Sequence, residues 1–199
     1  MAIIYRDVPY GSHPRQTVNL YQPNNYDLVT EFGISIRGVI LWIHAGGWTA
    51  GSKDINKNNY TNYYASSDWV YLQNAPGFNS GQYFDDDFCA AVADTGYFVI
   101  SANYRLASGA LPIYNGGGGE YPNNVNDIEE LYKYMVFPGY APVSNVNKAS
   151  WDLIVRYVKT YGLFIIGASA GGHLAVIGAF EGADKTGMWP RGIGSVVGP

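Results

Sequence analysis

Residues 167–171, with the sequence Gly-Ala-Ser-Ala-Gly, constrain the fold of this chain more than any other segment. An apolar run at 163–166 precedes them and is typical of a buried strand, whereas the Ala- and Gly-rich residues 169–180 predict a helix. A strand that turns directly into a helix strains the residue at the turn, and small neighbours on either side let the two elements approach closely. The pattern therefore predicts that Ser169 projects from the C-terminal edge of a sheet.

The other apolar segments alternate between short strands and helices, which favours an α/β fold with a mostly parallel sheet. We expect strands at 3–6, 17–21, 38–44, 97–103, 163–166 and 192–197, and helices at 85–95, 124–137 and 169–180. The first two strands should form an edge hairpin. The second helix should bury five residues at helical spacing, namely Val125, Ile128, Leu131, Tyr132 and Met135.

The length of the chain and two long connections indicate how it is organised into domains. The 199 residues predict one domain, residues 1–199. Two connections, at about 55–83 and 107–121, are longer than a compact domain normally uses and are predicted as loop insertions. The first is rich in aromatic residues, and both interpretations stay open: a lid over an acyl or aryl group, or a surface insertion.

Composition and charge exclude several functional classes. A net charge of -4 without a Lys/Arg cluster argues against nucleic-acid binding. No apolar run approaches the length of a membrane span, and residues 1–10 do not resemble a signal peptide, so we expect a cytoplasmic protein. The single cysteine, Cys89, is expected to pack in the core. The three histidines are far apart and have no cysteine partners, so no metal site is expected.

A second glycine-containing segment follows an earlier predicted strand. Residues 44–48 read His-Ala-Gly-Gly-Trp and lie where the strand at 38–44 ends. Glycines carry no side chain that blocks the backbone N–H groups, so such a loop can present these groups to a negative charge that develops in a reaction. We expect His44 to brace this loop rather than to transfer protons.

Four segments together resemble a known family. They are His-Ala-Gly-Gly-Trp at 44–48, Asn-Tyr-Arg-Leu-Ala at 103–107, Tyr-Pro at 121–122 with Asp127, and Gly-Ala-Ser-Ala-Gly-Gly-His-Leu-Ala at 167–175. In this order they resemble the carboxylesterase and lipase branch of the α/β-hydrolase-fold serine esterases, which is related to hormone-sensitive lipase and feruloyl-esterase-like proteins. The resemblance implies a mostly parallel central sheet flanked by helices.

The resemblance also implies roles for individual residues. Ser169 would be the nucleophile at a nucleophile elbow, and the backbone N–H groups of Gly46, Gly47 and Ala170 would form the oxyanion hole. The residues implied as supports of the site are His44, Trp48 and His173, and those implied as architectural supports are Tyr104, Arg105 and Asp127. The implied substrate is a small-molecule carboxylic ester, and the implied chemistry needs no cofactor.

The triad of this fold follows the chain order Ser, Asp or Glu, then His. After Ser169 the sequence contains Glu181 and Asp184, but its last histidine is His173, one helical turn beyond the serine. We therefore expect a hydrolase fold that is truncated after its sixth strand and lacks two triad residues. The sixth strand would then be an exposed edge, open to self-association or to a partner chain.

Several explanations of this pattern stay open. The favoured one is an esterase seen as a fragment or as one piece of a split gene, and the second is a non-catalytic hydrolase-like binding module. A complete catalyst with an unconventional base ranks last. Amide hydrolases of the kynurenine-formamidase or prolyl-oligopeptidase type share much of the pattern and form a further alternative. This chain alone is expected to turn over activated esters slowly or not at all.

Overall fold

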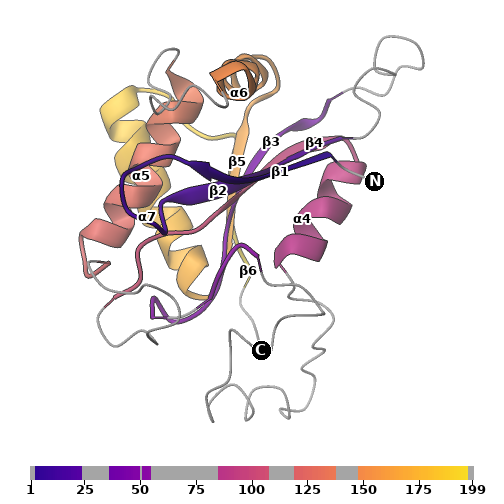
Figure 1. The fold of residues 1–199 in the computed structure, drawn as a ribbon. Helices are drawn as coiled ribbons and strands as arrows, with labels where there is room; N and C mark the ends of the chain where they lie inside the picture. Colours follow the sequence, from indigo (N-terminus) through magenta and orange to yellow (C-terminus); the bar gives the residue numbers. More distant parts are fainter. Residues whose placement is uncertain are drawn as a thin grey trace.

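The computed structural model describes residues 3–23, 36–49, 51–54, 85–107, 119–137 and 148–196. Within these ranges the strands are β1 Ile3–Pro9, β2 Thr17–Gln22, β3 Gly38–Ile43, β4 Tyr97–Ala102, β5 Leu163–Ala168 and β6 Gly192–Val196. The helices are α4 Asp85–Asp94, α5 Asn123–Val136, α6 Lys148–Tyr161 and α7 Ala170–Thr186. Figure 1 shows the sheet between two helical layers, with α5, α6 and α7 on one face and α4 on the other.

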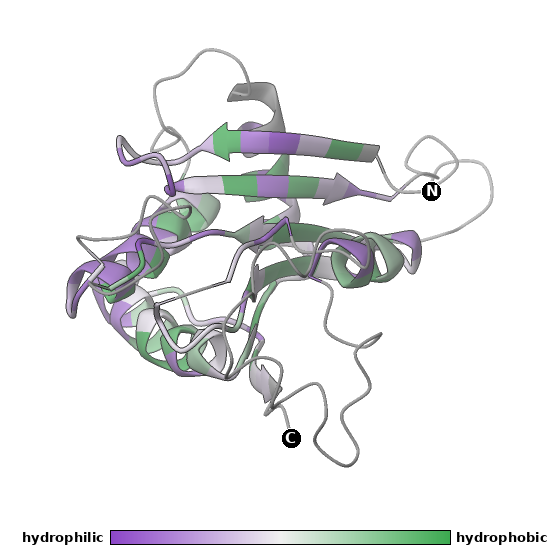
Figure 2. Cartoon of the chain, turned by 60° about the horizontal axis from the view of Figure 1, so that its bottom comes forward, coloured by the Kyte–Doolittle hydropathy of each residue, from purple (hydrophilic) through white to green (hydrophobic). Residues whose placement is uncertain are grey.

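The strands form one sheet in the order β1-β2-β4-β3-β5-β6. β1 and β2 form the predicted antiparallel hairpin, and β2 runs antiparallel to β4. The other neighbours, β4-β3, β3-β5 and β5-β6, are parallel. Every residue of β3 is buried, whereas Figure 2 shows both polar and apolar residues along the two hairpin strands. The predicted mostly parallel α/β sheet is confirmed, and parallel strands place their C-terminal ends at one edge.

Each face of the sheet has its own core. The larger core lies under α5, α6 and α7, and it includes all five residues that were predicted on α5, namely Val125, Ile128, Leu131, Tyr132 and Met135. The smaller core lies under α4 and contains Cys89, which is buried as predicted. Helices α4, α6 and α7, which precede β4, β5 and β6, therefore cover the sheet with their apolar sides, and the carboxyl edge of the sheet stays available for loops.

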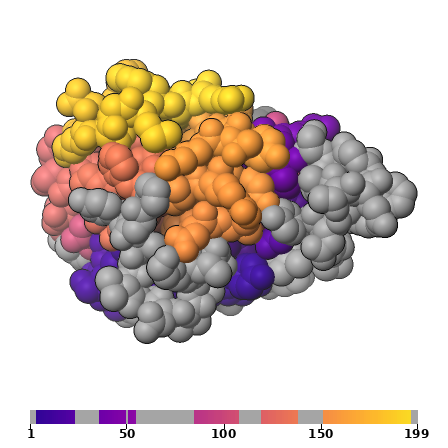
Figure 3. Space-filling view, turned by 90° about the horizontal axis from the view of Figure 1, so that it is seen from above, coloured from indigo at the N-terminus to yellow at the C-terminus, as the bar shows by residue number. Residues whose placement is uncertain are grey.

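Helix α6 was not predicted from the sequence. Its buried residues Trp151, Ile154, Val155 and Val158 recur at helical spacing, so the signal was present. Figure 3 shows α6, in orange, beside the yellow C-terminal part of the chain. Helix α7 extends farther than expected, to Thr186. The predicted loop at about 55–83 lies outside the described residues, as does most of the loop at about 107–121.

The acidic first turn of α4 fastens this helix to the sheet. Asp85 Oδ1 accepts a hydrogen bond of 2.5 Å from Trp42 Nε1 in β3. Asp86 accepts bonds from the Tyr21 hydroxyl at 2.6 Å and from Arg6 at 3.0 Å. Burial raises the pKa of Asp85 to about 7, although the bond from Trp42 acts in the opposite direction. Carboxylates at the start of a helix also interact favourably with the helix dipole.

The raised pKa of Asp85 predicts a dependence of stability on pH. The folded chain holds the Asp85 proton up to about pH 7, whereas the unfolded chain releases it near pH 3.8. The free energy of unfolding therefore falls as pH rises between these values, by up to about 1.4 kcal/mol per pH unit. Urea unfolding at several pH values should show that Asp85→Asn removes this contribution. Asp87→Asn, an exposed position in the same turn, is the control, and an identical pH profile for wild type and Asp85→Asn would contradict the prediction.

Candidate active site

Ser169 lies at the turn between β5, which ends at Ala168, and α7, which begins at Ala170. Its backbone angles are φ 49° and ψ -117°, and its side chain is exposed. A positive φ is unusual for a residue with a side chain, and a ψ this negative lies outside the left-handed region. Such a conformation costs about 1–3 kcal/mol and persists only where the surroundings enforce it. The strand-to-helix turn predicted around Ser169 is confirmed.

The glycines around Ser169 are required by close backbone approaches. A Cβ built on Gly167 would lie 2.2 Å from the carbonyl oxygen of Gly171. A Cβ on Gly171 would lie 2.2 Å from the carbonyl oxygen of Ile43 and 2.5 Å from that of His44. These distances are shorter than any real contact of a Cβ atom. The first turn of α7 is therefore pressed against the end of β3, and the serine turn lies beside the segment that starts at His44.

The segment that follows β3 has an unusual backbone. Gly46, Gly47 and Trp48 have consecutive positive φ values of 134°, 58° and 64°. The Trp48 ring packs edge-on against the ring of His173 in α7, with the centroids 5.4 Å apart. This contact and the approach of α7 to β3 bring the glycine segment to the same edge of the sheet as Ser169. The sequence-predicted site residues, including Ala170, therefore come from two neighbouring segments.

His44 is fully buried, and its ring contacts three other residues. It stacks on the Tyr104 ring with the centroids 4.4 Å apart. Its Nδ1 lies 2.6 Å from the Ala45 carbonyl oxygen, and its Nε2 lies 3.2 Å from Arg15 Nη2. Burial lowers the pKa of His44 to about 3, and the charge of Arg15 acts in the same direction. His44 is therefore a neutral imidazole inside the protein, as a bracing residue would be.

Arg15 is the residue that sequence reasoning missed. It follows β1 and is buried, with only 6% of its surface exposed. Its guanidinium donates hydrogen bonds to the carbonyl oxygens of Tyr104 at 2.8 Å and Gly51 at 3.0 Å, in addition to the contact with His44. An isolated arginine after a hairpin strand gives no local signal of such a role, because its partners lie far away in the sequence.

Asp127 and Arg105 support the same edge of the sheet from outside the site. The Asp127 carboxylate is fully buried and accepts bonds from Arg105 Nη2 at 2.6 Å and from the Arg105 backbone N–H at 2.8 Å. Arg105 Nε also donates to this carboxylate, at 2.9 Å, and so does Gln16 Nε2, at 2.9 Å. These contacts tie the exit of β4 to the start of α5 and to the hairpin, which is an architectural arrangement.

The three histidines of the chain all have other roles in the structure. His13 Nδ1 lies 3.1 Å from the backbone N–H of Arg15 in the hairpin connection, and His44 is buried and neutral. His173 is exposed, but it belongs to the same helix that begins after Ser169, and its ring packs against Trp48. None of these histidines therefore has the position of a base that approaches Ser169 from a separate loop.

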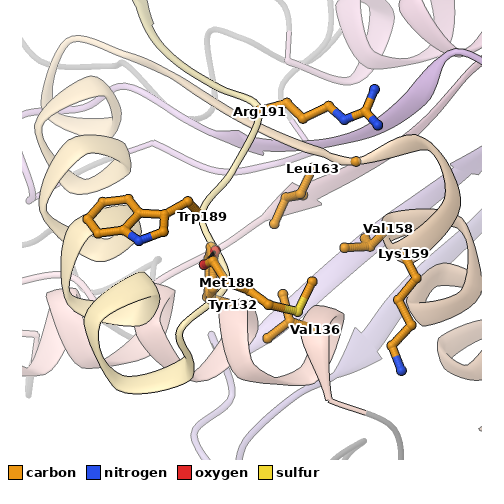
Figure 4. Close-up of a pocket in the computed structure, with 9 residues that line it drawn as sticks. Tyr132, Val136, Val158, Lys159, Leu163, Met188, Trp189 and Arg191 are labelled. Carbon is orange, nitrogen blue, oxygen red and sulfur yellow. Dashed lines mark hydrogen bonds between the residues drawn. The ribbon is translucent and has the colours of Figure 1, made fainter.

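A cavity of about 170 Å³ lies at the opposite end of β5 from Ser169 (Figure 4). It is lined by Tyr132, Val136, Val158, Lys159, Gly162, Leu163, Met188, Trp189 and Arg191. Leu163 begins β5, whereas Ser169 follows the end of that strand. The cavity and the serine turn are therefore separate features. No helix among the described residues is long and apolar enough to cross a membrane, and these residues contain no cluster suited to a metal ion.

Comparison with known proteins shows similarity in structure alone. No protein-family model matches the sequence, and none of the curated proteins does. A bacterial heroin esterase has 20% identity and a TM-score of 0.52, over 96% of this chain and 41% of its own. Esterase B from Lactobacillus rhamnosis has 20% identity and a TM-score of 0.48, over 98% of this chain and 47% of its own.

A further similar structure is MGS-M1, an alpha/beta hydrolase enzyme from a Medee basin deep-sea metagenome library, with 16% identity and a TM-score of 0.48. It is matched over 87% of this chain and 49% of its own. The chain thus spans about half the length of these solved structures. Strand order, the strand–serine–helix turn and the similarity to the heroin esterase structure agree. The chain has the α/β-hydrolase fold.

Proposed function

We propose that the protein is a serine hydrolase of carboxylic esters in which Ser169 is the nucleophile. The observation that carries the proposal is the strained backbone of Ser169, whose side chain is exposed at a turn packed against the end of β3. Strain of this kind persists where the fold enforces it and is concentrated at functional sites. The esterase names of the solved structures, above all the heroin esterase, favour esters over other acyl compounds.

The proposed reaction uses groups from both neighbouring segments. The Ser169 Oγ attacks the ester carbonyl carbon and its proton passes to a base, so that a tetrahedral oxyanion forms. The backbone N–H groups of Gly46, Gly47 and Ala170 hold this oxyanion, and loss of one such donor typically costs about 10²–10³-fold in rate. The alcohol leaves with a proton, and water then hydrolyses the acyl-serine to release the acid. The rings of Trp48 and His173 pack against each other and so connect the two segments.

We propose that none of the three histidines of this sequence is the base that activates Ser169. The positions of His13, His44 and His173 support this, since each ring has a different environment and role. Among the described strands β6 pairs with β5 alone, and we propose that its other side is where self-association or binding of a partner chain would occur.

An assay with matched substrates tests the proposed function. Because the chain lacks a well-placed base, imidazole added to the buffer should supply one and raise the hydrolysis of p-nitrophenyl acetate several-fold. The rate measured with Ser169→Ala gives the direct hydrolysis by imidazole, and the wild type should exceed it. Ser12→Ala, which changes an exposed serine in the hairpin connection, should keep the full increase. The matched anilide, 4-nitroacetanilide, should not be hydrolysed. Faster cleavage of the anilide would favour the amide-hydrolase alternative, and equal rates for wild type and Ser169→Ala would contradict the proposal.

A further inference from the structure

One buried guanidinium contacts both ends of the glycine loop, of which the structure describes residues 44–49 and 51. Arg15 Nη2 lies 3.2 Å from the ring of His44, where the loop begins, and 3.0 Å from the carbonyl oxygen of Gly51, where it ends. Arg15 Nε donates to the carbonyl oxygen of Tyr104, whose ring stacks on His44. The two ends of the loop also lie close together, because a Cβ on Gly51 would lie 2.1 Å from the Ala45 carbonyl oxygen. The hairpin therefore fixes the shape of a loop that belongs to β3.

These contacts determine which nitrogen of His44 carries the hydrogen. A carbonyl oxygen only accepts hydrogen bonds, so the 2.6 Å contact between His44 Nδ1 and the Ala45 carbonyl places the hydrogen on Nδ1. A neutral imidazole then has a bare Nε2, which accepts a hydrogen bond. Arginine is always protonated and can only donate, so Arg15 matches the bare Nε2 and disfavours the other tautomer.

The orientation of the Ala45 carbonyl in turn fixes the next N–H group. The peptide bond between Ala45 and Gly46 is trans, so the carbonyl and the N–H of this planar unit point in opposite directions. The carbonyl points to the buried His44 ring, and the Gly46 N–H must therefore point away from it. Within the described ranges, no backbone carbonyl accepts a hydrogen bond from Gly46.

We propose that Arg15 is a positioning residue for the glycine loop. By selecting the tautomer of His44, it orients the Ala45 carbonyl and so turns the Gly46 N–H toward the reacting carbonyl. Arg15 itself touches neither substrate nor Ser169 in this mechanism. The inference about catalysis rests on the proposed function, whereas the inference about the His44 tautomer stands on the buried contacts alone. The two parts therefore have separate tests.

The first test is NMR of the chain labelled with ¹⁵N-histidine, in which two-bond ¹H–¹⁵N correlations identify the protonated ring nitrogen. Single His13→Gln and His173→Gln variants assign the signals, since the chain has three histidines. We expect His44 to be neutral with hydrogen on Nδ1 in the wild type at neutral pH. Hydrogen on Nε2 in the wild type would overturn the proposal, and this outcome does not depend on any enzymatic activity.

The second test removes the guanidinium. In Arg15→Met we expect the Nε2–H tautomer of His44 to become populated. We also expect the Ser169-dependent kcat, defined as the rate lost in Ser169→Ala, to fall about 10- to 100-fold with little change in KM, because an oxyanion donor acts mainly in the transition state. Arg15→Lys keeps the charge and a single donor, so it should lose less. Unchanged tautomer and unchanged kcat in a folded variant would overturn the proposal.

A third variant shows whether Arg15 acts through His44. Asparagine at position 44 keeps an N–H donor near the Ala45 carbonyl but has no imidazole tautomer for Arg15 to select. Arg15→Met should therefore lower the Ser169-dependent kcat less in the His44→Asn background than in the wild type. Equal losses in the two backgrounds would overturn the proposed route through His44. All these rates are measured with imidazole in the buffer, as in the assay of the proposed function. Absence of any Ser169-dependent rate in the wild type under these conditions would instead contradict the proposed function, and the wild-type tautomer would still test the role of Arg15.

Discussion

Gly171→Ala is expected to lower the free energy of unfolding by about 3 kcal/mol or more. The added Cβ would lie 2.2 Å from the Ile43 carbonyl oxygen and 2.5 Å from that of His44, and both atoms belong to the backbone. Neither can move without shifting the end of β3 away from α7. Overpacking of this kind costs about 3 kcal/mol or more, which is a large share of the stability of a typical domain. Circular dichroism and urea unfolding measure the loss directly.

Gly187→Ala is the matched control for this prediction. Gly187 also belongs to α7, as its C-cap, with a φ of 69°, but a Cβ built there meets nothing within 4 Å. Its replacement therefore adds only the cost of a left-handed conformation, about 1–2 kcal/mol. A Gly171→Ala variant that is as stable as Gly187→Ala would show that α7 does not approach β3 as closely as described here.

Asp127→Ala is expected to lower the free energy of unfolding by about 3–5 kcal/mol. The carboxylate is fully buried, and its removal takes away the acceptor of Arg105 Nε and of the Gln16 amide, so that Arg105 Nη2 keeps only its bond to the Asn123 carbonyl oxygen among those described. Arg105 donates to this carboxylate in the folded chain, and that bond raises the pKa of the guanidinium. Urea unfolding near neutral pH, where the ion pair is formed, measures the loss.

Glu130→Ala provides the comparison for Asp127→Ala. Glu130 lies on the same helix and pairs with Lys133 at 3.7 Å, but its side chain is 40% exposed. Exposed pairs contribute about 0–1 kcal/mol, so this variant should unfold almost as the wild type does. If the two variants lose similar free energy, the contacts of Asp127 do not have the structural importance given to them here.

The sequence was sufficient to predict features that depend on short-range patterns. The apolar runs predicted β3, β4 and β5, the helical spacing predicted α5, and the glycines at 167 and 171 predicted the turn at Ser169. In each case the pattern itself contains the physical cause, which is burial on both faces, an apolar helix side, or a close approach of backbones. Helix α6 was missed even though its apolar residues recur at helical spacing.

Features that depend on distant partners were not visible in the sequence. Arg15 contacts His44, Gly51 and Tyr104 only because the hairpin folds across the end of the sheet. Asp85 lies at the start of a helix that the sequence predicted, but the sequence does not show that burial raises its pKa against the effect of the hydrogen bond from Trp42. Burial and partner choice are set by tertiary packing, which a single sequence does not reveal.

Intact-mass labelling with a fluorophosphonate tests the central claim most directly, because the reagent reports an activated serine hydroxyl. In the presence of imidazole we expect one adduct per chain, located by peptide mapping at Ser169 and absent from Ser169→Ala. Without imidazole the same adduct should form slowly or not at all, since the three histidines of the chain have other roles in the structure. A folded wild-type chain that forms no adduct with imidazole, or an adduct that persists in Ser169→Ala, would contradict the assignment of Ser169 as the nucleophile of an ester hydrolase.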